Sequence, residues 1–381
     1  MRKLLCFSIL LIFLAVPAPA AEPLKIGLMA PMTGPWSNSG REMKQVVDLL
    51  AEELNAKGGV LGRKIEVVAV NDEGTPTGAV QAALTLARQN VAAVIGSLTS
   101  AATEASQPIF NEAKILQITN ASTAVGLTER KLKYFFRTCP RDDEQSRVIV
   151  QAMRKMNLRK IAILHDNSLY ARGLADDVRS MAVQSGLDIV FDGALTPGGQ
   201  DYSAILKKIR DSEPEAVFFS GYYQEAGVLL RQKHDLNWNV VFIGGDGANN
   251  SDLVLIAGRK AAEGFYFLSP PLPDDLTSKE ALAFIQKFRK KYGVPVKSID
   301  AILAGDAFRV ITAAIGEMRS TDADRLADHL HTAFVDPSGL TGSINFNFKG
   351  DRLSDLYGVY RVDADGRFVI QRMFQYGRIV K

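Results

Sequence analysis

The stretches VIGSLTSAAT (Val94–Thr103) and ILQITNAST (Ile115–Thr123) indicate which kind of fold this chain adopts. In each of them a short apolar run, typical of a buried β-strand, ends abruptly in small hydroxylated residues. An α/β sheet presents polar groups to small ligands in this way, at the carboxyl ends of its strands. The two stretches therefore predict a ligand-binding sheet edge.

Ser100 stands immediately before a predicted helix over residues 101–113. Its hydroxyl and the free N–H groups of the helix N-terminus can converge on an anion, for which a carboxylate is the best candidate. Serine before a helix is also an ordinary N-cap, and for Ser100 alone capping is the favoured interpretation. The second hydroxyl-rich loop shifts that balance toward a ligand site.

Around these stretches, apolar runs with strand character alternate with segments of helical periodicity, which predicts βαβ units and parallel sheets. A second series of such units begins near Asp142, so we expect two sheets of similar size. Pattern alone does not assign the last helices and β-type runs to either sheet. The expected elements are strands at 24–29, 64–70, 91–95, 115–118, 160–164, 188–193, 216–220, 240–243 and 264–268, helices at 43–54, 77–88, 101–113, 142–156, 172–184, 202–212, 225–234, 279–292, 299–318 and 323–333, and β-type runs at 342–348, 357–362 and 368–376.

The length of 381 residues and the hydrophobic content of 47% allow a large core and favour two domains. Residues 1–20 have the parts of a secretory signal peptide: basic Arg2 and Lys3, an apolar run, and the small-residue end Ala18-Pro19-Ala20. The apolar run is too short to span a membrane. We expect cleavage after Ala20 and a soluble mature protein in the periplasm.

Charge and cysteine content exclude several classes of protein. Loss of Arg2 and Lys3 lowers the formal net charge from +3 to +1, which gives no electrostatic footprint for nucleic acid or an anionic membrane. Cys139 would be the single cysteine of the mature chain, so no intramolecular disulfide is expected.

Motifs of the common enzyme classes are missing from the sequence. No G-x-G-x-x-G follows the first strand, and neither a P-loop nor a G-x-S-x-G motif occurs. The histidines and cysteines are scattered without metal-ligand spacing. We therefore expect no catalytic residues, no cofactor and no metal.

Three strand ends of the second series carry further candidate ligand contacts, at Asn167–Tyr170, Gly221–Tyr223 and Gly244–Gly247. Aromatic rings there can close over an apolar ligand while their hydroxyls stay hydrogen-bonded, and Asp246 can accept from an ammonium group. Each has an ordinary structural explanation, because Asp is common in glycine-rich turns and paired tyrosines often only pack. Their occurrence together, at equivalent strand ends, favours a binding site.

With these motifs in place, the mature chain resembles the branched-chain amino-acid binding proteins of ABC importers, which are type I periplasmic binding proteins related to the leucine/isoleucine/valine-binding protein. The resemblance extends over essentially the whole mature chain. The segments that carry it are Lys25-Ile26-Gly27, Met32-Thr33-Gly34-Pro35, Asn55-Ala56-Lys57-Gly58-Gly59, residues 94–100, residues 161–170, Gly221-Tyr222-Tyr223 and Ala261-Ala262-Glu263-Gly264.

The resemblance implies an α/β fold of two Rossmann-like lobes with parallel sheets, joined by three crossovers. Residues 21–141 and 270–358 would form lobe 1, and residues 142–269 and 359–381 would form lobe 2. The expected ligand-binding residues are Ser100, Ala121, Ser122, Thr123, Tyr170, Tyr222 and Asp246.

The resemblance also implies a role for each of these residues. Ser100 and Thr123, with the backbone of residues 121–122, would hold the α-carboxylate of an amino acid and share its α-ammonium. Asp246 would pair with the ammonium. Tyr170 and Tyr222 would close over the ligand from lobe 2, and Tyr222 is preferred to Tyr223 because its spacing to Asp246 matches the family.

The chain departs from the family at several positions. Ser39 stands where close relatives have an aromatic residue in the side-chain pocket, so Trp36 or another residue must fill that space or the pocket is larger. Asp246 replaces a glutamate of the leucine-binding relatives. Gly74 and Thr99 stand where some relatives have a disulfide, so that crosslink is missing here.

The sequence thus predicts an extracytoplasmic receptor, expected to be a monomer, that captures an amino acid and delivers it to an ABC permease. A branched-chain or other apolar amino acid is the expected ligand. One alternative is an amide or urea receptor of the same superfamily, which would have no use for an ammonium-pairing Asp246. A less favoured alternative is an enzyme on a doubly wound scaffold, because the predicted cleft holds no activated base or cofactor loop.

Overall fold

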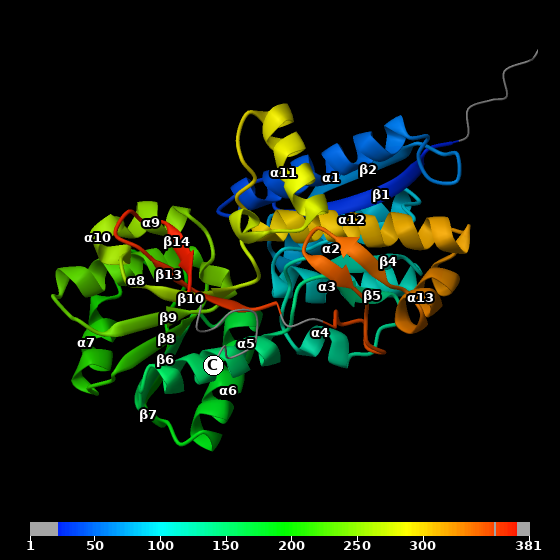
Figure 1. Ribbon diagram of the computed structural model, residues 1–381. Coiled ribbons are helices and arrows are strands. Elements are labelled where there is room, and N and C mark those ends of the chain that lie inside the picture. Colours follow the sequence, from blue (N-terminus) through cyan, green and yellow to red (C-terminus); the bar gives the residue numbers. More distant parts are fainter. Residues whose placement is uncertain (1–21, 354–355, 372–381) are drawn as a thin grey trace, which may run out of the picture.

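A computed structural model describes residues 22–353 and 356–371 of the chain, which form two lobes (Figure 1). Each lobe is a β-sheet with helices packed against it. The predicted signal peptide and the end of the last β-type run, after residue 371, lie outside the described residues. Within the described part of the chain, the helices are too short or too polar to cross a bilayer.

Lobe 1 is built on a five-stranded sheet in the order β2-β1-β3-β4-β5, and all of its strands are parallel. Its central strands are buried and mostly apolar, as expected where helices cover both faces of a parallel sheet. The strands are β1 (Leu24–Ala30), β2 (Ile65–Asn71), β3 (Ala93–Ile95), β4 (Leu116–Thr119) and β5 (Phe135–Arg137).

The helices of lobe 1 come from two distant parts of the chain. The long helix α12 packs closely against α1, where a Cβ atom at Gly305 would lie 2.9 Å from Val46 Cγ1. This close approach joins the C-terminal helices to the N-terminal sheet in one hydrophobic core. The elements are α1 (Ser37–Ala56), α2 (Pro76–Arg88), α3 (Ser100–Glu112), α4 (Gly126–Glu129), α11 (Lys279–Tyr292), α12 (Ile299–Met318), α13 (Ala323–Thr332) and the hairpin of β11 (Asp336–Gly339) and β12 (Gly342–Ile344).

Lobe 2 is built on a seven-stranded sheet in the order β14-β13-β10-β9-β8-β6-β7. The strands from β10 to β7 are parallel, whereas β13 runs antiparallel to β10 and β14 antiparallel to β13. The antiparallel pair arises because the chain re-enters lobe 2 beside β10 and then turns back. The strands are β6 (Lys160–His165), β7 (Asp188–Ala194), β8 (Ala216–Ser220), β9 (Val241–Gly244), β10 (Tyr266–Ser269), β13 (Gly358–Val362) and β14 (Phe368–Ile370).

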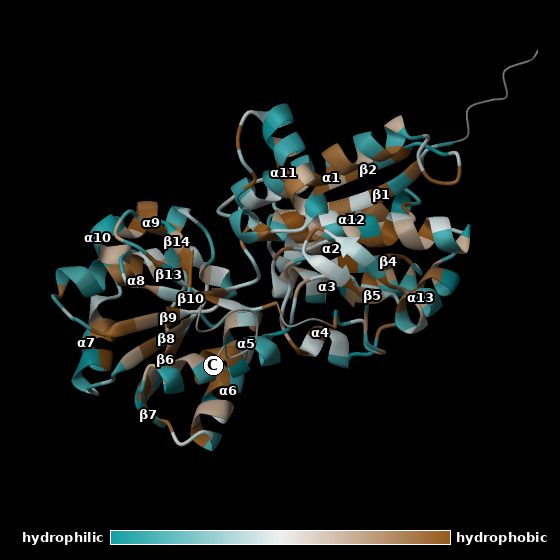
Figure 2. Ribbon diagram, viewed as in Figure 1, coloured by the Kyte–Doolittle hydropathy of each residue, from teal (hydrophilic) through white to brown (hydrophobic). Residues whose placement is uncertain are grey.

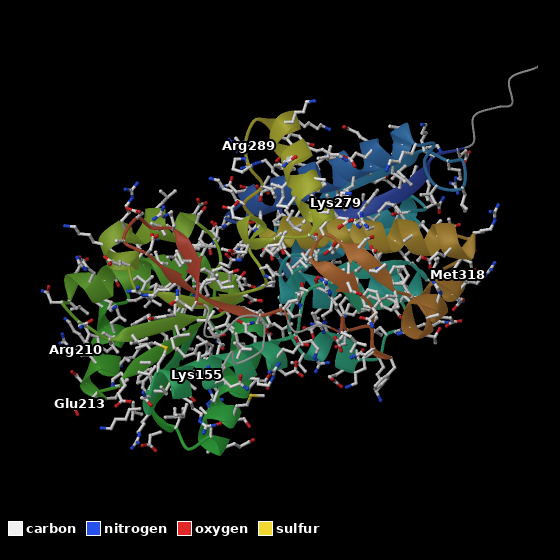
Figure 3. The ribbon with its side chains drawn as sticks, viewed as in Figure 1. Lys155, Arg210, Glu213, Lys279, Arg289 and Met318 are labelled. Atoms are coloured by element: carbon white, nitrogen blue, oxygen red, sulfur yellow. The ribbon has the colours of Figure 1, made fainter. Side chains whose placement is uncertain are left out.

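Helices cover both faces of the lobe 2 sheet and leave their charged sides to solvent. Figure 2 shows apolar strands beneath helices with hydrophilic outer faces. Arg210, near the end of α7, and Glu213, just beyond it, lie at the outer edge of lobe 2 (Figure 3). The helices between these strands are α5 (Asp142–Lys155), α6 (Leu169–Gln184), α7 (Ser203–Asp211), α8 (Tyr223–Asp235), η1 (Asp246–Ala248), α9 (Asp252–Ala257) and α10 (Arg259–Ala262), and η2 (Pro273–Asp275) follows β10.

The chain leaves lobe 1 after β5, returns to it after β10 and leaves it again before β13. The segments that connect the lobes therefore lie side by side although they are far apart in the sequence. Where the first segment ends, Gln145 on α5 donates a hydrogen bond to the hydroxyl of Tyr357, which precedes β13 (3.2 Å). The connecting segments thus meet next to the gap between the lobes.

Candidate functional site

A cavity lies between the lobes, where loops that follow the strands of both sheets meet. Lobe 1 contributes the loops after β1, β3 and β4 and the first turn of α12, and lobe 2 contributes the loops after β6, β8 and β9. The lining residues are Trp36, Ser39, Leu98, Ser100, Ala121, Thr123 and Asp300 from lobe 1, and Tyr170, Tyr222, Tyr223, Asp246, Gly247, Asn249 and Asn250 from lobe 2.

All of the predicted ligand-binding residues except Ser122 line this cavity. The Ser122 side chain is buried inside lobe 1, where its hydroxyl lies 2.7 Å from Thr103 Oγ1 and donates to the Ser97 carbonyl at 3.1 Å. Its side chain therefore fixes the loop after β4 to the loop after β3. A role for its backbone in ligand binding stays a prediction.

Ser100 is not the N-cap of its helix, contrary to the interpretation favoured for this residue alone. Thr99 is the N-cap, and its hydroxyl accepts a hydrogen bond from the Ala102 N–H at 3.3 Å. Ser100 is the first residue of α3, and its hydroxyl faces the cavity and accepts from the Ala124 N–H at 3.3 Å. Serine and threonine are both common N-caps, so the sequence did not distinguish these adjacent positions.

The loop that carries Thr99 and Ser100 is held by polar contacts beneath it. The Ser97 hydroxyl donates to the buried carboxylate of Asp72, whose pKa is raised mainly by burial. Thr99 Oγ1 donates to the Gly74 carbonyl at 2.9 Å. A hydrogen bond therefore joins the two positions at which some relatives were expected to have a disulfide.

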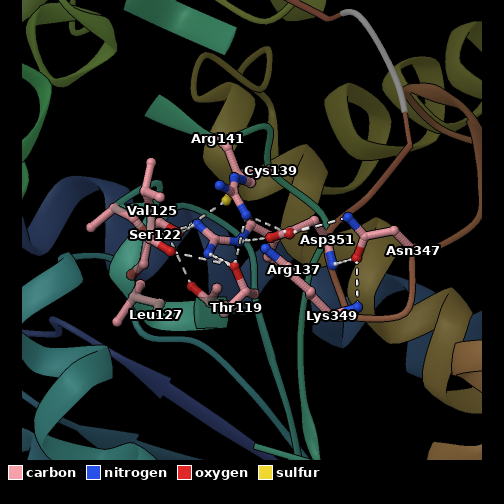
Figure 4. Close-up of polar contacts among 12 residues, drawn as sticks. Thr119, Ser122, Val125, Leu127, Arg137, Cys139, Arg141, Asn347, Lys349 and Asp351 are labelled. Carbon is pink, nitrogen blue, oxygen red and sulfur yellow. Dashed lines mark hydrogen bonds and ion pairs between the residues drawn. The ribbon is translucent and has the colours of Figure 1, made fainter. Parts of the chain in front are cut away.

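Arg137, at the end of β5, fixes the backbone of the second hydroxyl-rich loop (Figure 4). The guanidinium is fully buried, and its Nη1 donates to the carbonyls of Ser122 and Ala124 at 3.0 and 3.1 Å. Its Nε forms an ion pair with Asp351 Oδ1 at 2.9 Å. Sequence reasoning missed Arg137, and the signal that would have found it is a lone arginine directly after the apolar pair Phe135-Phe136.

Asp246 occupies the lobe 2 side of the cavity and is held by phenol groups. Tyr357 donates to Asp246 Oδ2 at 2.8 Å, and Tyr170 also donates to this carboxylate. The Asp246 N–H donates to Gln145 Oε1 at 2.7 Å. Burial raises the pKa of Asp246, whereas these hydrogen bonds counteract the rise. Tyr357 and Gln145 were not predicted, because no motif marks them.

Two more carboxyl groups, those of Asp142 and Asp300, interact electrostatically with Asp246. Asp142, at the start of α5, is buried, and burial together with the charge of Asp246 raises its pKa well above the usual range. Burial raises the pKa of Asp300 to about 7, with smaller contributions from the charges of Asp246 and Glu42. Carboxylates that share a desolvated site repel one another, so a cation in the cavity would relieve the repulsion. Among the described residues no cluster of His, Cys, Asp or Glu is arranged to hold a metal ion.

Aromatic rings close the cavity across the gap between the lobes. Trp36 of lobe 1 meets Tyr222 of lobe 2 edge to face, with 5.4 Å between ring centroids, and Tyr222 meets Tyr170 at the same distance. The Tyr223 hydroxyl donates across the gap to the Pro35 carbonyl at 2.8 Å. Tyr222 and Tyr223 both line the cavity. The Tyr223 hydroxyl, however, already donates to an acceptor in lobe 1.

This cavity can bind and enclose a small zwitterion. Hydroxyls at the N-terminus of α3 suit an anionic group, because unpaired N–H groups and the helix dipole favour negative charge there. The Asp246 carboxylate suits a cationic group on the opposite lobe. The aromatic rings can cover an apolar portion between them.

Comparison with known protein families gives one match over most of the chain. Residues 23–367 match the family described as periplasmic binding protein. A Leu/Ile/Val-binding protein, BraC3, from Rhizobium johnstonii is 32% identical over 354 residues, which cover 91% of this chain and 94% of that protein.

Solved structures of similar proteins have the same fold. The leucine binding protein LivK from Thermotoga maritima has a TM-score of 0.84 and 28% identity, over 91% of this chain and 97% of that one. The branched-chain amino acid transporter substrate binding protein LivJ from Streptococcus pneumoniae, in complex with isoleucine, has a TM-score of 0.81 and 26% identity, over 92% of this chain and 100% of that one.

Proposed function

Because the chain belongs to the periplasmic binding protein family, we propose that it is an extracytoplasmic receptor that captures an amino acid between its lobes. The observation that carries the proposal is the distribution of charge-binding groups in one cavity. Hydroxyls of Ser100 and Thr123 lie on lobe 1, and the Asp246 carboxylate lies on lobe 2. This arrangement matches the α-carboxylate and α-ammonium of an amino acid.

The proposed mechanism is closure of the lobes around the ligand by a hinge motion, of which periplasmic binding proteins are a standard example. A ligand that touches both lobes favours the closed state by the contacts that exist only there. Ser100 would hold the carboxylate from lobe 1, while Tyr170 and Asp246 would approach from lobe 2. Capture and release of a ligand involve no chemical reaction, which is consistent with a cavity whose lining contains no activated nucleophile. We therefore propose that the chain has no enzymatic activity.

The names of the relatives point to the side-chain class and to the partner. The relatives named above bind Leu/Ile/Val, leucine or isoleucine according to their names and titles, and one is described as part of a branched-chain amino acid transporter. We propose that this chain acts as a monomer, binds an amino acid of this kind and delivers it to an ABC permease.

We propose that the hinge joins a lobe of residues 21–141 and 270–358 to a lobe of residues 142–269 and 359–381.

We also propose that residues 1–20 direct export to the periplasm. N-terminal sequencing of the exported protein tests this proposal. The chain should begin at Ala21 or Glu22, and an intact Met1 on protein in the cytoplasm would contradict it.

A thermal-shift screen with amino acids, acetamide and urea tests the ligand class, because a ligand of the folded state raises its melting temperature. We expect amino acids alone to stabilise the protein. Stabilisation by acetamide or urea instead would favour the alternative amide or urea receptor.

The Asp246→Asn variant then tests the grip on the ammonium. It keeps the shape of the side chain but removes the charge, so the amino acid with the largest thermal shift should bind more than tenfold more weakly in calorimetry. Breaking a buried charge pair typically costs about 2–5 kcal/mol. The 2-hydroxy acid analogue of that amino acid should lose much less affinity.

A matched control is Asp274→Asn, which changes an exposed carboxylate outside the cavity. It should leave both affinities unchanged. Equal weakening of the amino acid and its 2-hydroxy analogue by Asp246→Asn would show that Asp246 does not pair with an ammonium.

A further inference from the structure

One part of the cavity wall has no task in the proposed grip on the amino-acid main chain. Asp300, in the first turn of α12, lines the cavity from lobe 1, whereas Asp246 lines it from lobe 2. Ser39 of α1 and the amides Asn249 and Asn250 line it as well, and these three residues continue into the groove outside. This part of the cavity wall is therefore polar, whereas a branched-chain side chain packs best against apolar groups.

The Asp300 carboxylate has no partner among the described residues. Its backbone carbonyl accepts a hydrogen bond from Asn120 at 2.9 Å, but within residues 22–353 and 356–371 no donor or cation reaches its side chain. The charges that act on it are those of Asp246 and Glu42, which have the same sign. A partly buried carboxylate without a donor is costly unless a ligand supplies one.

Helix capping does not explain Asp300. Ser298 is the N-cap of α12, and its hydroxyl accepts from the Ala301 N–H at 3.3 Å. An acidic residue in the first turn is stabilised by the helix dipole when it is charged, which would lower its pKa. Burial has the opposite effect here and raises the pKa of Asp300 to about 7, so the position is unfavourable for the carboxylate of the empty protein.

Ser39 lies at the same part of the wall as Asp300. One turn further along α1, the Glu42 carboxylate accepts hydrogen bonds from the backbone N–H groups of Lys297 and Ser298, at 2.9 and 2.6 Å. These bonds tie the start of α1 to the start of α12. Ser39 and Asp300 therefore line the cavity from two helices that are tied together at their starts, and Ser39 stands where close relatives were expected to have an aromatic ring.

We infer that the ligand donates a hydrogen bond from its side chain to Asp300, so that the preferred amino acid carries a hydroxyl or ammonium group instead of a purely apolar side chain. The inference rests on the proposed function in taking the amino-acid main chain as held by Ser100 and Asp246, but it departs from the apolar side chain that the names of the relatives suggest. A site built to accept a hydrogen bond rejects the analogue without the donor, since its buried acceptor is then left unpaired.

Two pairs of ligands with matched shapes test the inference by calorimetric titration. Threonine and valine differ in a neutral hydroxyl, and lysine and norleucine differ in an ammonium group. In at least one pair we expect the donor to bind about tenfold to a hundredfold more tightly, the range for one hydrogen bond to a charged acceptor. The pair that shows the preference tells whether the donor is neutral or cationic.

Two variants assign the preference to Asp300. Asp300→Ala removes the acceptor and should reduce the preference to less than about threefold, whereas Asp300→Asn keeps an acceptor oxygen and should abolish only a preference for lysine. Asp274→Ala, at an exposed carboxylate, is the matched control and should leave the preference unchanged. The comparison of the matched ligands on the wild-type protein does not depend on whether the variants fold.

Three outcomes would overturn the inference. Equal or tighter binding of both valine and norleucine by the wild-type protein overturns it while amino-acid binding stands. A donor preference that survives Asp300→Ala also overturns it. If no amino acid binds the wild-type protein, the proposed function fails and the inference fails with it.

Discussion

Thr99 and Ser100 divide two tasks that a single hydroxyl residue would otherwise combine. Thr99 caps α3 and bonds to the Gly74 carbonyl, so its hydroxyl is occupied within lobe 1. The Ser100 hydroxyl has only a long contact from the Ala124 N–H, at 3.3 Å, and faces the cavity. A substitution at Ser100 can therefore change ligand binding without removing the helix cap.

The Ser100→Ala variant should bind its amino acid about tenfold to a hundredfold more weakly, because one hydrogen bond to the ligand carboxylate is lost. Its free energy of unfolding without ligand should change by less than about 1 kcal/mol, because the cap remains. Calorimetric titration and urea denaturation measure the two quantities.

Thr99→Ala is the matched control for this prediction. It should lower the free energy of unfolding by about 1 kcal/mol or more, because it removes the cap and the bond to Gly74. Its effect on affinity should be smaller than that of Ser100→Ala. An unchanged affinity in Ser100→Ala would mean that this hydroxyl serves only the loop.

At the scale of elements, the sequence predicted long segments well and short ones poorly. The predicted helix over residues 299–318 agrees with α12, since Ser298 caps it and its apolar face is continuous. The strands β5 and β11 were missed, because three or four residues give too little periodicity to detect, whereas β12 lies within the predicted β-type run at 342–348. The antiparallel direction of β13 depends on where the chain re-enters lobe 2, which no local pattern records.

The same distinction applies to the cavity. Residues within a few positions of a strand's end, such as Tyr170, Tyr222 and Asp246, could be predicted because parallel strands bring their carboxyl ends to one edge. Asp300 and Gln145 lie in the first turns of helices, where an acidic or amide residue has an ordinary explanation. Only the crossings of the chain between the lobes bring these helices to the cavity.

Arg137 shows how one element is positioned by a distant one. Its partner Asp351 also accepts a charge-assisted hydrogen bond from Arg141 Nη1 at 2.8 Å, just before α5. Arginine suits this place because its planar group bonds in several directions at once. The segment around Asp351 therefore fixes both the loop after β4 and the start of the crossing into lobe 2.

At the scale of the whole molecule, the contacts between lobes determine how readily the cavity closes. Tyr223 on α8 donates to Pro35 before α1, and Asn38 on α1 donates to Asp252 on α9 at 3.3 Å. Both bonds join the two lobes. In the proposed hinge closure they would stabilise the closed state from the rim and add to what the ligand contributes inside.

The Tyr223→Phe variant isolates this contribution. Loss of one hydrogen bond of about 0.5–1.5 kcal/mol should lower the population of the closed state and weaken ligand binding by about twofold to tenfold. Because the bond forms after the ligand enters, stopped-flow measurements should show faster dissociation by a similar factor and little change in association. Ligand-free stability in urea should stay nearly the same, since the bond joins two lobes that each keep their own core.

Tyr202→Phe is the matched control, because the Tyr202 hydroxyl also donates to a backbone carbonyl, that of Thr196 at 2.9 Å, but within lobe 2. This variant should lower the free energy of unfolding and leave both rate constants of binding unchanged. The two tyrosines thus separate a bond that holds a lobe together from a bond that holds the lobes closed. If Tyr223→Phe destabilised the empty protein and left dissociation unchanged, the contact with Pro35 would belong to the folded framework and closure would depend on the ligand alone.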